Sequence, residues 1–322
     1  MKIFIRVALA LGVFGVRGAL AQTAPDAIDA HLIAARNAAG FDFTGTLARL
    51  CIAPPLVTAV RDVAPGPAPA RETWFAEPAK VFDNLYFVGS KIHSSWALTS
   101  SEGIILIDTL FTYNSEEEIV GGLKKLGLDP AKIKYVIITH AHGDHVGGAK
   151  LLQDKFGSHI VMGGPDWDLI ERSVNAYPLG KPKRDIVADD GQKITLGDTS
   201  VTIVITPGHT PGTLSMIFTV KDKGRPLTVA YSGGTAFNFP STVANFDTYI
   251  NSQRKMAAAA AAANATVFMS NHSEFDGAVS KIKMLAGRKA GEPHPFEVGA
   301  DAVARYFKVS EECAEVAQLK LK

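Results

Sequence analysis

Several features that would assign a protein to a common class are scarce or missing in this sequence. Its 322 residues include only two cysteines, and 33 basic residues almost balance 32 acidic ones. The balanced charge argues against a binder of nucleic acid or of a membrane surface. Apart from the N-terminus, no stretch approaches ~20 continuous apolar residues, so we expect no transmembrane helix. A serine-hydrolase elbow, G-x-S-x-G, is also absent, which argues against a serine nucleophile.

The first residues have the pattern of a secretory signal peptide. Lys2 and Arg6 give a positive start, an apolar stretch runs from Val7 to Val16, and Ala19-Leu20-Ala21 provides a small-x-small cleavage pattern. We therefore predict a signal peptide at 1–21 and a periplasmic or secreted protein with no membrane attachment after cleavage. The alternative, an N-terminal membrane anchor, requires a longer apolar run.

The two cysteines, Cys51 and Cys313, are far apart in the chain and do not form a zinc-finger pattern. In an oxidising compartment such a pair favours a disulfide. That bond would close a long loop and stabilise the fold by roughly 2–4 kcal/mol. Two buried free thiols are the alternative, and the sequence does not decide between them.

The chain divides into an N-terminal extension, 22–80, which contains a Pro-rich spacer at 64–70, and a main domain, 81–322. A capping-box spacing between Ser115 and Glu118 predicts the start of one of its helices. From apolar patterning and turn residues we expect strands at 85–88, 96–99, 104–107, 133–138, 159–162, 201–205, 213–220, 227–231 and 267–269, and helices at 24–40, 115–126, 147–156 and 245–264.

Residues 138–148, ITHAHGDHVGG, concentrate potential metal ligands directly after a predicted buried strand. His140, His142, Asp144 and His145 lie within six positions, at the strand end where α/β folds present catalytic groups. Imidazoles with one carboxylate suit zinc. A solvated His-rich turn is the alternative, and the clustering makes it the weaker interpretation.

With this HxHxDH motif the chain resembles the metallo-β-lactamase superfamily from about Asp83 to the C-terminus. The resemblance implies an α/β fold, the four-layer αββα sandwich, with zinc at one edge of its two sheets. It also implies that His209, in TPGHTPG, and His272, in FMSNHSEFD, complete the ligand set. Asp108, in ILIDT, matches the aspartate that precedes the zinc loop, and we expect its carboxylate to orient that loop.

The segment 231–237, YSGGTAF, indicates which subclass of the superfamily the chain resembles. Many two-metal hydrolases of the superfamily, including glyoxalase II and many lactonases, have a metal-bridging aspartate where this chain has Gly234. The remaining ligands are similar to those of the third (B3-like) subclass of zinc β-lactamases. The resemblance then implies two zinc ions per chain, one held by His140, His142 and His209, and the other by Asp144, His145 and His272.

From this resemblance we expect a dizinc hydrolase that acts on a small molecule. A zinc-bound hydroxide would attack a carbonyl, and we expect that of a β-lactam ring, with Asp144 as a ligand that also orients the nucleophile. A hydrolase of lactones, esters or thioesters is the main alternative, and a non-catalytic zinc-binding protein is a third. Ser232, Thr235 and Ser273 are candidate substrate-binding residues. The sequence does not indicate the oligomeric state.

Two further histidines and one long segment lie outside this ligand set. His93 either lines the mouth of the cleft or packs between strands, and His294 is an alternative ligand should His272 be misplaced. The segment 167–190 is expected to form a flap over the cleft. Its basic residues either attract an anionic substrate or are simply solvated, and they are Lys181, Lys183 and Arg184.

Overall fold

The computed structural model describes residues 24–52, 66–174, 176–177 and 180–321. The predicted signal peptide, 1–21, lies outside the described residues. Within the described part of the chain, none of the helices combines the length and the apolar character that a membrane span requires.

Two β-sheets form the centre of the molecule. The larger sheet has the order β1-β2-β3-β4-β5-β6-β7, and β4 to β7 run parallel. Its strands are β1 (Ala79–Lys80), β2 (Leu85–Phe87), β3 (Trp96–Thr99), β4 (Ile104–Ile107), β5 (Ile133–Ile137), β6 (His159–Gly163) and β7 (Ile186–Ala188). The smaller sheet has the order β12-β11-β10-β9-β8. Its strands are β8 (Lys193–Leu196), β9 (Thr199–Ile205), β10 (Leu214–Asp222), β11 (Arg225–Ser232) and β12 (Val267–Ser270).

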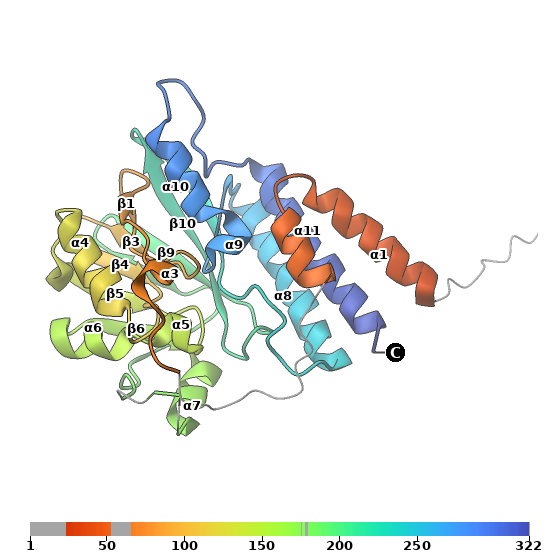
Figure 1. Cartoon of the computed structure of the whole chain (residues 1–322), viewed down its shortest axis with the longest axis horizontal. Coiled ribbons are helices and arrows are strands. Elements are labelled where there is room, and N and C mark those ends of the chain that lie inside the picture. Colours follow the sequence, from red (N-terminus) through yellow and green to blue (C-terminus); the bar gives the residue numbers. More distant parts are fainter. Residues whose placement is uncertain (1–23, 53–65, 175, 178–179, 322) are drawn as a thin grey trace, which may run out of the picture.

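Helices cover the outer faces of both sheets. Figure 1 shows α4 and α6 on one side of the sheets and α8, α11 and α1 on the other. The helices are α1 (Ala24–Ala39), α2 (Thr44–Leu47), η1 (Ala48–Ile52), α3 (Arg71–Trp74), η2 (Glu116–Gly121), α4 (Gly122–Lys125), η3 (Pro130–Lys132), α5 (Gly143–Val146), α6 (Ala149–Phe156), α7 (Gly164–Arg172), α8 (Val243–Ala262), α9 (Ser273–Asp276), α10 (Ala278–Ala286) and α11 (Ala300–Leu319).

The burial of alternate strand residues explains this layering. In β4, Ile105 and Ile107 belong to the core between the sheets, whereas Leu106 belongs to the core beneath α4 and α6. In β11, Val229 faces the same central core, whereas Ala230 packs with residues of α8 and α11. Since successive side chains point to opposite faces of a strand, apolar runs buried on both faces need two sheets covered by helices. The predicted four-layer αββα sandwich is confirmed.

The predicted capping box at Ser115 is wrong. The Ser115 hydroxyl donates to the carbonyl oxygens of Thr109 and Phe111, and its side chain caps no helix N-terminus. Glu118 is buried, and its carboxylate accepts a hydrogen bond from the Ala76 amide at 3.1 Å. The Ser115 hydroxyl thus serves the preceding turn and the Glu118 carboxylate a tertiary contact, and the segment divides into η2 and α4 instead of one capped helix.

The N-terminal helices of the described chain pack against the C-terminal helix α11. Helix α1 lies beside α11, as Figure 1 shows, and the ring of Phe43 packs on that of Tyr306 with centroids 5.5 Å apart. A disulfide joins Cys51 in η1 to Cys313 in α11, so the structure contains the predicted bond. The same N-terminal region also reaches α9, where Glu274 pairs with Arg49 of η1.

Candidate metal centre

The residues predicted to bind metal come from loops that follow different strands. Four of them, from His140 to His145, follow β5 directly, and Asp108 follows β4. His209 lies between β9 and β10, and His272 follows β12. The structure brings all of these side chains together at one edge of the two sheets.

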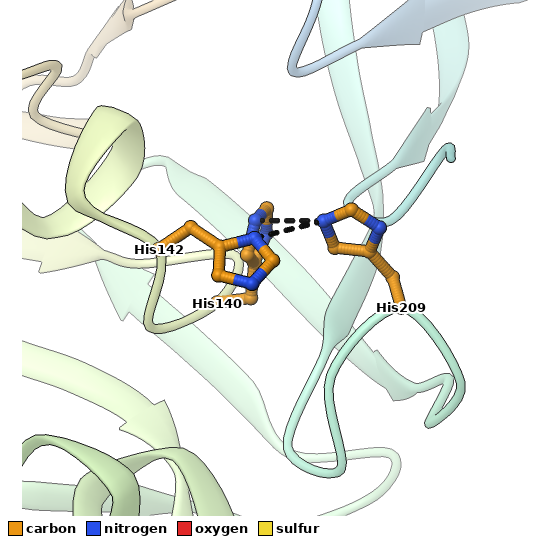
Figure 2. Close-up of side chains that lie close together, drawn as sticks. All are labelled: His140, His142 and His209. Carbon is orange, nitrogen blue, oxygen red and sulfur yellow. Dashed lines mark hydrogen bonds between the residues drawn. The ribbon is translucent and has the colours of Figure 1, made fainter. Parts of the chain in front are cut away.

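Three histidines form the first cluster: His140, His142 and His209. Figure 2 shows their rings facing one another; the Nε2 atom of His209 is 3.1 Å from His140 Nε2 and 3.1 Å from His142 Nδ1. The other ring nitrogen of His140 donates to the Gly233 carbonyl at 3.0 Å, and that of His209 to the Ala236 carbonyl at 2.6 Å. These backbone acceptors fix the tautomers that leave both Nε2 lone pairs free for a cation.

The first cluster fits a metal ion on chemical grounds. Burial, followed by neighbouring imidazoles, lowers the pKa of His140 and of His209 well below its ordinary value, so both rings are neutral. Unprotonated nitrogens that face each other at 3.1 Å repel unless a cation or a proton lies between them. The donors of a tetrahedral zinc ion, each about 2.0–2.1 Å from the metal, are about 3.3 Å apart, close to the separation here.

The donor atoms of His93, Asp144 and His272 lie within 4.8 Å of one another, and His145 completes the second cluster beside Asp144 and His272. The Oδ2 atom of Asp144 is 3.0 Å from His145 Nε2, 3.3 Å from His272 Nε2 and 3.4 Å from His93 Nε2. The Nε2 atoms of His145 and His272 are 3.1 Å apart. His93, for which the sequence left packing and the cleft mouth as alternatives, thus lies beside Asp144 and His272 within ligand range.

Asp108 lies beneath the second cluster and is fully buried. Its Oδ2 accepts from His145 Nδ1 at 2.8 Å, and its Oδ1 accepts from the Thr139 amide at 2.7 Å. Its backbone has φ of 60°, a conformation that non-glycine residues seldom adopt and that recurs at functional loops. Asp108 therefore turns the Nε2 atom of His145 toward Asp144, the orienting role that we predicted for this carboxylate.

Charge differs between the two clusters when no metal is bound. Burial alone lowers the pKa of His145, but Asp144 and Asp108 raise it to about 10. Burial alone raises the pKa of Asp144, but His145 and His272 hold it well below its ordinary value. Burial lowers the pKa of His93 to about 3. An ion pair between Asp144 and His145 thus occupies the second cluster at neutral pH.

Asp166 is a buried carboxylate that the sequence analysis missed. Its Oδ2 accepts from the Ala141 amide at 2.8 Å and from the Thr210 hydroxyl at 2.7 Å, and its Oδ1 accepts from the Gly212 amide at 2.7 Å. Asp166 thereby ties the loop of His140 and His142 to that of His209. Its position in the first turn after β6, at the same sheet edge, was the available signal.

The glycine pair of YSGGTAF has two structural functions. The Gly233 carbonyl accepts hydrogen bonds from His140 Nδ1 and from Asn271 Nδ2, the latter at 2.8 Å. A Cβ atom on Gly234 would lie 2.7 Å from His209 Cβ and 2.8 Å from Thr213 Cγ2. No side chain fits at Gly234 without moving the loop that carries His209.

A cavity of about 970 Å³ opens beside the first cluster. This volume is at the upper end of the range for small-molecule sites. Arg172 is the one residue with a permanent charge among the described lining residues. The wall of the cavity also includes His142, His209, Phe111, Tyr113, Leu169, Tyr177, Pro207, Phe239 and Pro240.

The structure places the other candidates differently. Ser232, Thr235 and Ser273 are buried, and none is among the described residues that line the cavity, so their substrate-binding roles stay predictions. His294 belongs to neither cluster; its Nε2 donates to the Val81 carbonyl at 2.9 Å, and its ring stacks on Phe82.

The described part of the segment 167–190 is helical at its start and returns to the sheet at β7, so it is not one continuous loop. Leu169, Arg172 and Tyr177 line the cavity, and the Tyr177 hydroxyl donates to the Ala141 carbonyl at 2.6 Å. The three basic residues singled out in this segment are not among the described lining residues. Arg184 is paired with Asp168 instead.

Buried imidazoles and carboxylates that converge beside a cavity define a candidate metal-dependent hydrolase. The family model of the metallo-beta-lactamase superfamily matches residues 88–223. The structure is similar to that of BJP-1, a subclass B3 metallo-beta-lactamase of Bradyrhizobium japonicum, with 31% sequence identity and a TM-score of 0.61. That match covers 73% of this chain and 91% of BJP-1. The chain belongs to the metallo-β-lactamase superfamily and is a hydrolase of that superfamily.

Curated relatives with other activities also match. An N-acyl homoserine lactonase of a Bacillus species is 30% identical over 138 residues, which are 41% of this chain and 52% of the relative. A hydroxyacylglutathione hydrolase of Pseudomonas putida (strain GB-1) is 30% identical over 102 residues, which are 32% of this chain and 33% of the relative. The chain thus spans about half of the first relative and a third of the second.

Proposed function

We propose that this chain is an exported dizinc hydrolase that opens the β-lactam ring. The observation that carries the proposal is the pair of clusters beside one cavity, at a site where Gly234 leaves no room for a bridging carboxylate. The similarity to a subclass B3 enzyme over most of both chains supports it. The predicted leader supports export to the periplasm or the exterior.

His140, His142 and His209 would hold one zinc ion, and Asp144, His145 and His272 the other. When bound, zinc supplies Lewis acidity, which activates water and polarises a carbonyl oxygen. Asp144 is ionised, so its carboxylate can orient water held beside the metal. His142 and His209 reach the cavity wall, so a carbonyl bound in the cavity lies next to the first cluster.

The cavity wall fits an amphipathic anion. Phe111, Tyr113 and Phe239 offer apolar surface for a bulky side chain. Arg172 offers a guanidinium to a carboxylate, such as the one that β-lactams carry next to the ring nitrogen. Glu274, an acidic residue close to His272 in sequence, is paired with Arg49 and is not among the described lining residues.

A substrate panel tests the proposal. Purified zinc-loaded protein should hydrolyse penicillins or carbapenems and should lose this activity on chelation and in His142→Ala. Arg172→Ala should raise KM for an anionic β-lactam about tenfold with a smaller change in kcat, because a charge-assisted hydrogen bond contributes roughly 1.5–3 kcal/mol. His159→Ala, at an exposed histidine remote from both clusters, is the matched control. No turnover across the β-lactams would refute the proposal.

A second candidate function is hydrolysis of a lactone or thioester. It is favoured by the matches to an N-acyl homoserine lactonase and a hydroxyacylglutathione hydrolase, and by an apolar cavity that suits an acyl chain. The same panel should include an N-acyl homoserine lactone and a glutathione thioester. Turnover of either compound with β-lactams ignored would establish this alternative.

A further inference from the structure

His93 lies in the turn between β2 and β3. Strands β3, β4 and β5 separate this turn from the zinc-loop motif, which begins at His140. Its Nε2 is 3.4 Å from Asp144 Oδ2, and its ring is 5.0 Å from that of His272, edge to face. We propose that His93 is a further protein ligand of the second metal ion, together with Asp144 and His272, whose donor atoms lie within 4.8 Å of its own. The proposal rests on the dizinc part of the proposed function and does not depend on the substrate.

The backbone holds His93 in place. The Ser90 amide donates to the His93 carbonyl at 2.8 Å, and the His93 amide donates to the Ser90 hydroxyl at 3.1 Å. A Cβ atom on Gly89 would lie 2.6 Å from the Ser95 amide nitrogen, so the turn closes only because residue 89 is glycine. Such a tight turn fixes the direction of the imidazole before any metal binds.

The turn is also joined directly to the loop of His272. His93 pairs with His272 in an antiparallel bridge. On either side of it, the Ser94 amide donates to the Asn271 carbonyl at 2.9 Å, and the Ser273 amide donates to the Ile92 carbonyl at 2.7 Å. Backbone hydrogen bonds thus hold the His93 and His272 segments side by side, which suits two ligands of one ion.

The alternative to metal binding is that His93 only donates a hydrogen bond to Asp144. The 3.4 Å between His93 Nε2 and Asp144 Oδ2 is long for an N–H···O bond, which is normally about 2.7–3.2 Å. It agrees with the separation of about 3.3 Å between two donors of one tetrahedral zinc ion. The His93 side chain is also mostly buried, with 18% exposed, so a solvated role is poorly supported.

The donor atoms of His93, Asp144 and His272 lie within 4.8 Å of one another, so one ion can contact all three. His145 Nε2 adjoins this group through Asp144, at 3.0 Å, and His272, at 3.1 Å. The three-histidine cluster lies beside the cavity and would be the centre with an open position for substrate.

Metal titration of the whole mature chain tests the assignment without any substrate. The proteins are wild type, His93→Ala, His93→Gln and the control His159→Gln, whose histidine is exposed and 3.0 Å from Asp185. Gln can still donate a hydrogen bond to Asp144 but is a poor zinc ligand. Both His93 variants should lose roughly 100-fold in affinity for the second zinc equivalent, while the first equivalent and the control are unchanged. Cobalt-loaded variants should show altered visible bands, because one nitrogen donor is gone.

Wild-type zinc affinity and an unchanged cobalt spectrum in His93→Gln would overturn the proposal in favour of the hydrogen bond. If His159→Gln lost as much affinity for the second zinc equivalent, the proposal would be overturned, because the loss would then be a general effect on folding. Thermal unfolding of each variant would show such an effect. A wild type that binds one equivalent only would overturn it together with the dizinc assignment. Failure to hydrolyse β-lactams would refute the proposed substrate and leave the titration result standing.

Discussion

The first cluster is oriented by the backbone, whereas the second is oriented by carboxylates. The Gly233 and Ala236 carbonyls hold His140 and His209, while Asp108 holds His145. Burial and neighbouring imidazoles lower the pKa of His140 and of His209, whereas Asp144 and Asp108 raise the pKa of His145 and retain a proton on it. The two sites, a few ångströms apart, should therefore bind the same metal with different dependence on charge and pH.

The largest expected effect comes from removing the carboxylate beneath the second cluster. Asp108→Ala deprives both His145 and the Thr139 amide of their acceptor. We expect the metal affinity of the second cluster and kcat/KM to fall about 100-fold, with the first cluster less affected. Metal content after gel filtration and steady-state kinetics measure this. Equal loss at both clusters would mean that Asp108 shapes the whole loop and not the second cluster alone.

Substitution of Gly234 should weaken metal binding at the first cluster. In Gly234→Asp the new Cβ meets His209 and Thr213, so the carboxylate cannot be added without displacing a ligand. We expect affinity at the first cluster to fall by roughly 10- to 100-fold, with no gain of a bridged centre. Gly234→Ala should share most of the loss, because the Cβ itself causes the clash. A tighter-binding Gly234→Asp variant would contradict this packing argument.

The pH dependence of metal binding should sharpen the contrast. Because the pKa of metal-free His145 is about 10, metal at the second cluster must displace a proton at neutral pH. Apparent affinity there should fall about tenfold for each unit that the pH drops below that pKa. At the first cluster the imidazole pKa values are lowered, so affinity should stay nearly flat over roughly pH 6 to 8. Calorimetry in buffers of different ionisation enthalpy counts the protons released.

The disulfide should affect neither cluster. Cys51→Ser with Cys313→Ser releases η1 from α11, and we expect the free energy of unfolding to fall by roughly 2–4 kcal/mol. Zinc affinity and stoichiometry below the unfolding temperature should equal those of wild type. Denaturant unfolding and a metal titration make the comparison. A parallel loss of zinc would show that the terminal helices support the metal loops.

Much of the fold could be predicted because apolar runs and turn residues are local signals. The strand at 133–138 and the long helix at 245–264 agree with β5 and α8 within about two residues, the usual uncertainty of boundaries. The capping box at Ser115 was wrong because its hydroxyl donates to the preceding carbonyls of Thr109 and Phe111, and because the Glu118 carboxylate accepts from the distant Ala76 amide. Local propensity does not include such tertiary partners.

The site divides in the same way. Residues within HAHGDH are recognisable because four ligands share one loop. His93 and Asp166 are single residues whose partners, Asp144 and Gly212, come from other loops. Nothing in a single sequence states that these loops meet. The space around Gly234 was likewise invisible, although the missing carboxylate was evident.

The close packing at Gly234 also bears on which variants this protein can reach. A bridging aspartate needs more than one nucleotide change in effect, since Gly234→Asp alone collides with Thr213 and with the ligand His209. Thr213→Ser would remove the Cγ2 atom and keep the hydroxyl that accepts from the Thr210 amide, but the collision with His209 Cβ would remain. A carboxylate-bridged centre therefore also requires a shift of the loop that carries His209, so variants with a new substrate should change the cavity wall before the metal ligands.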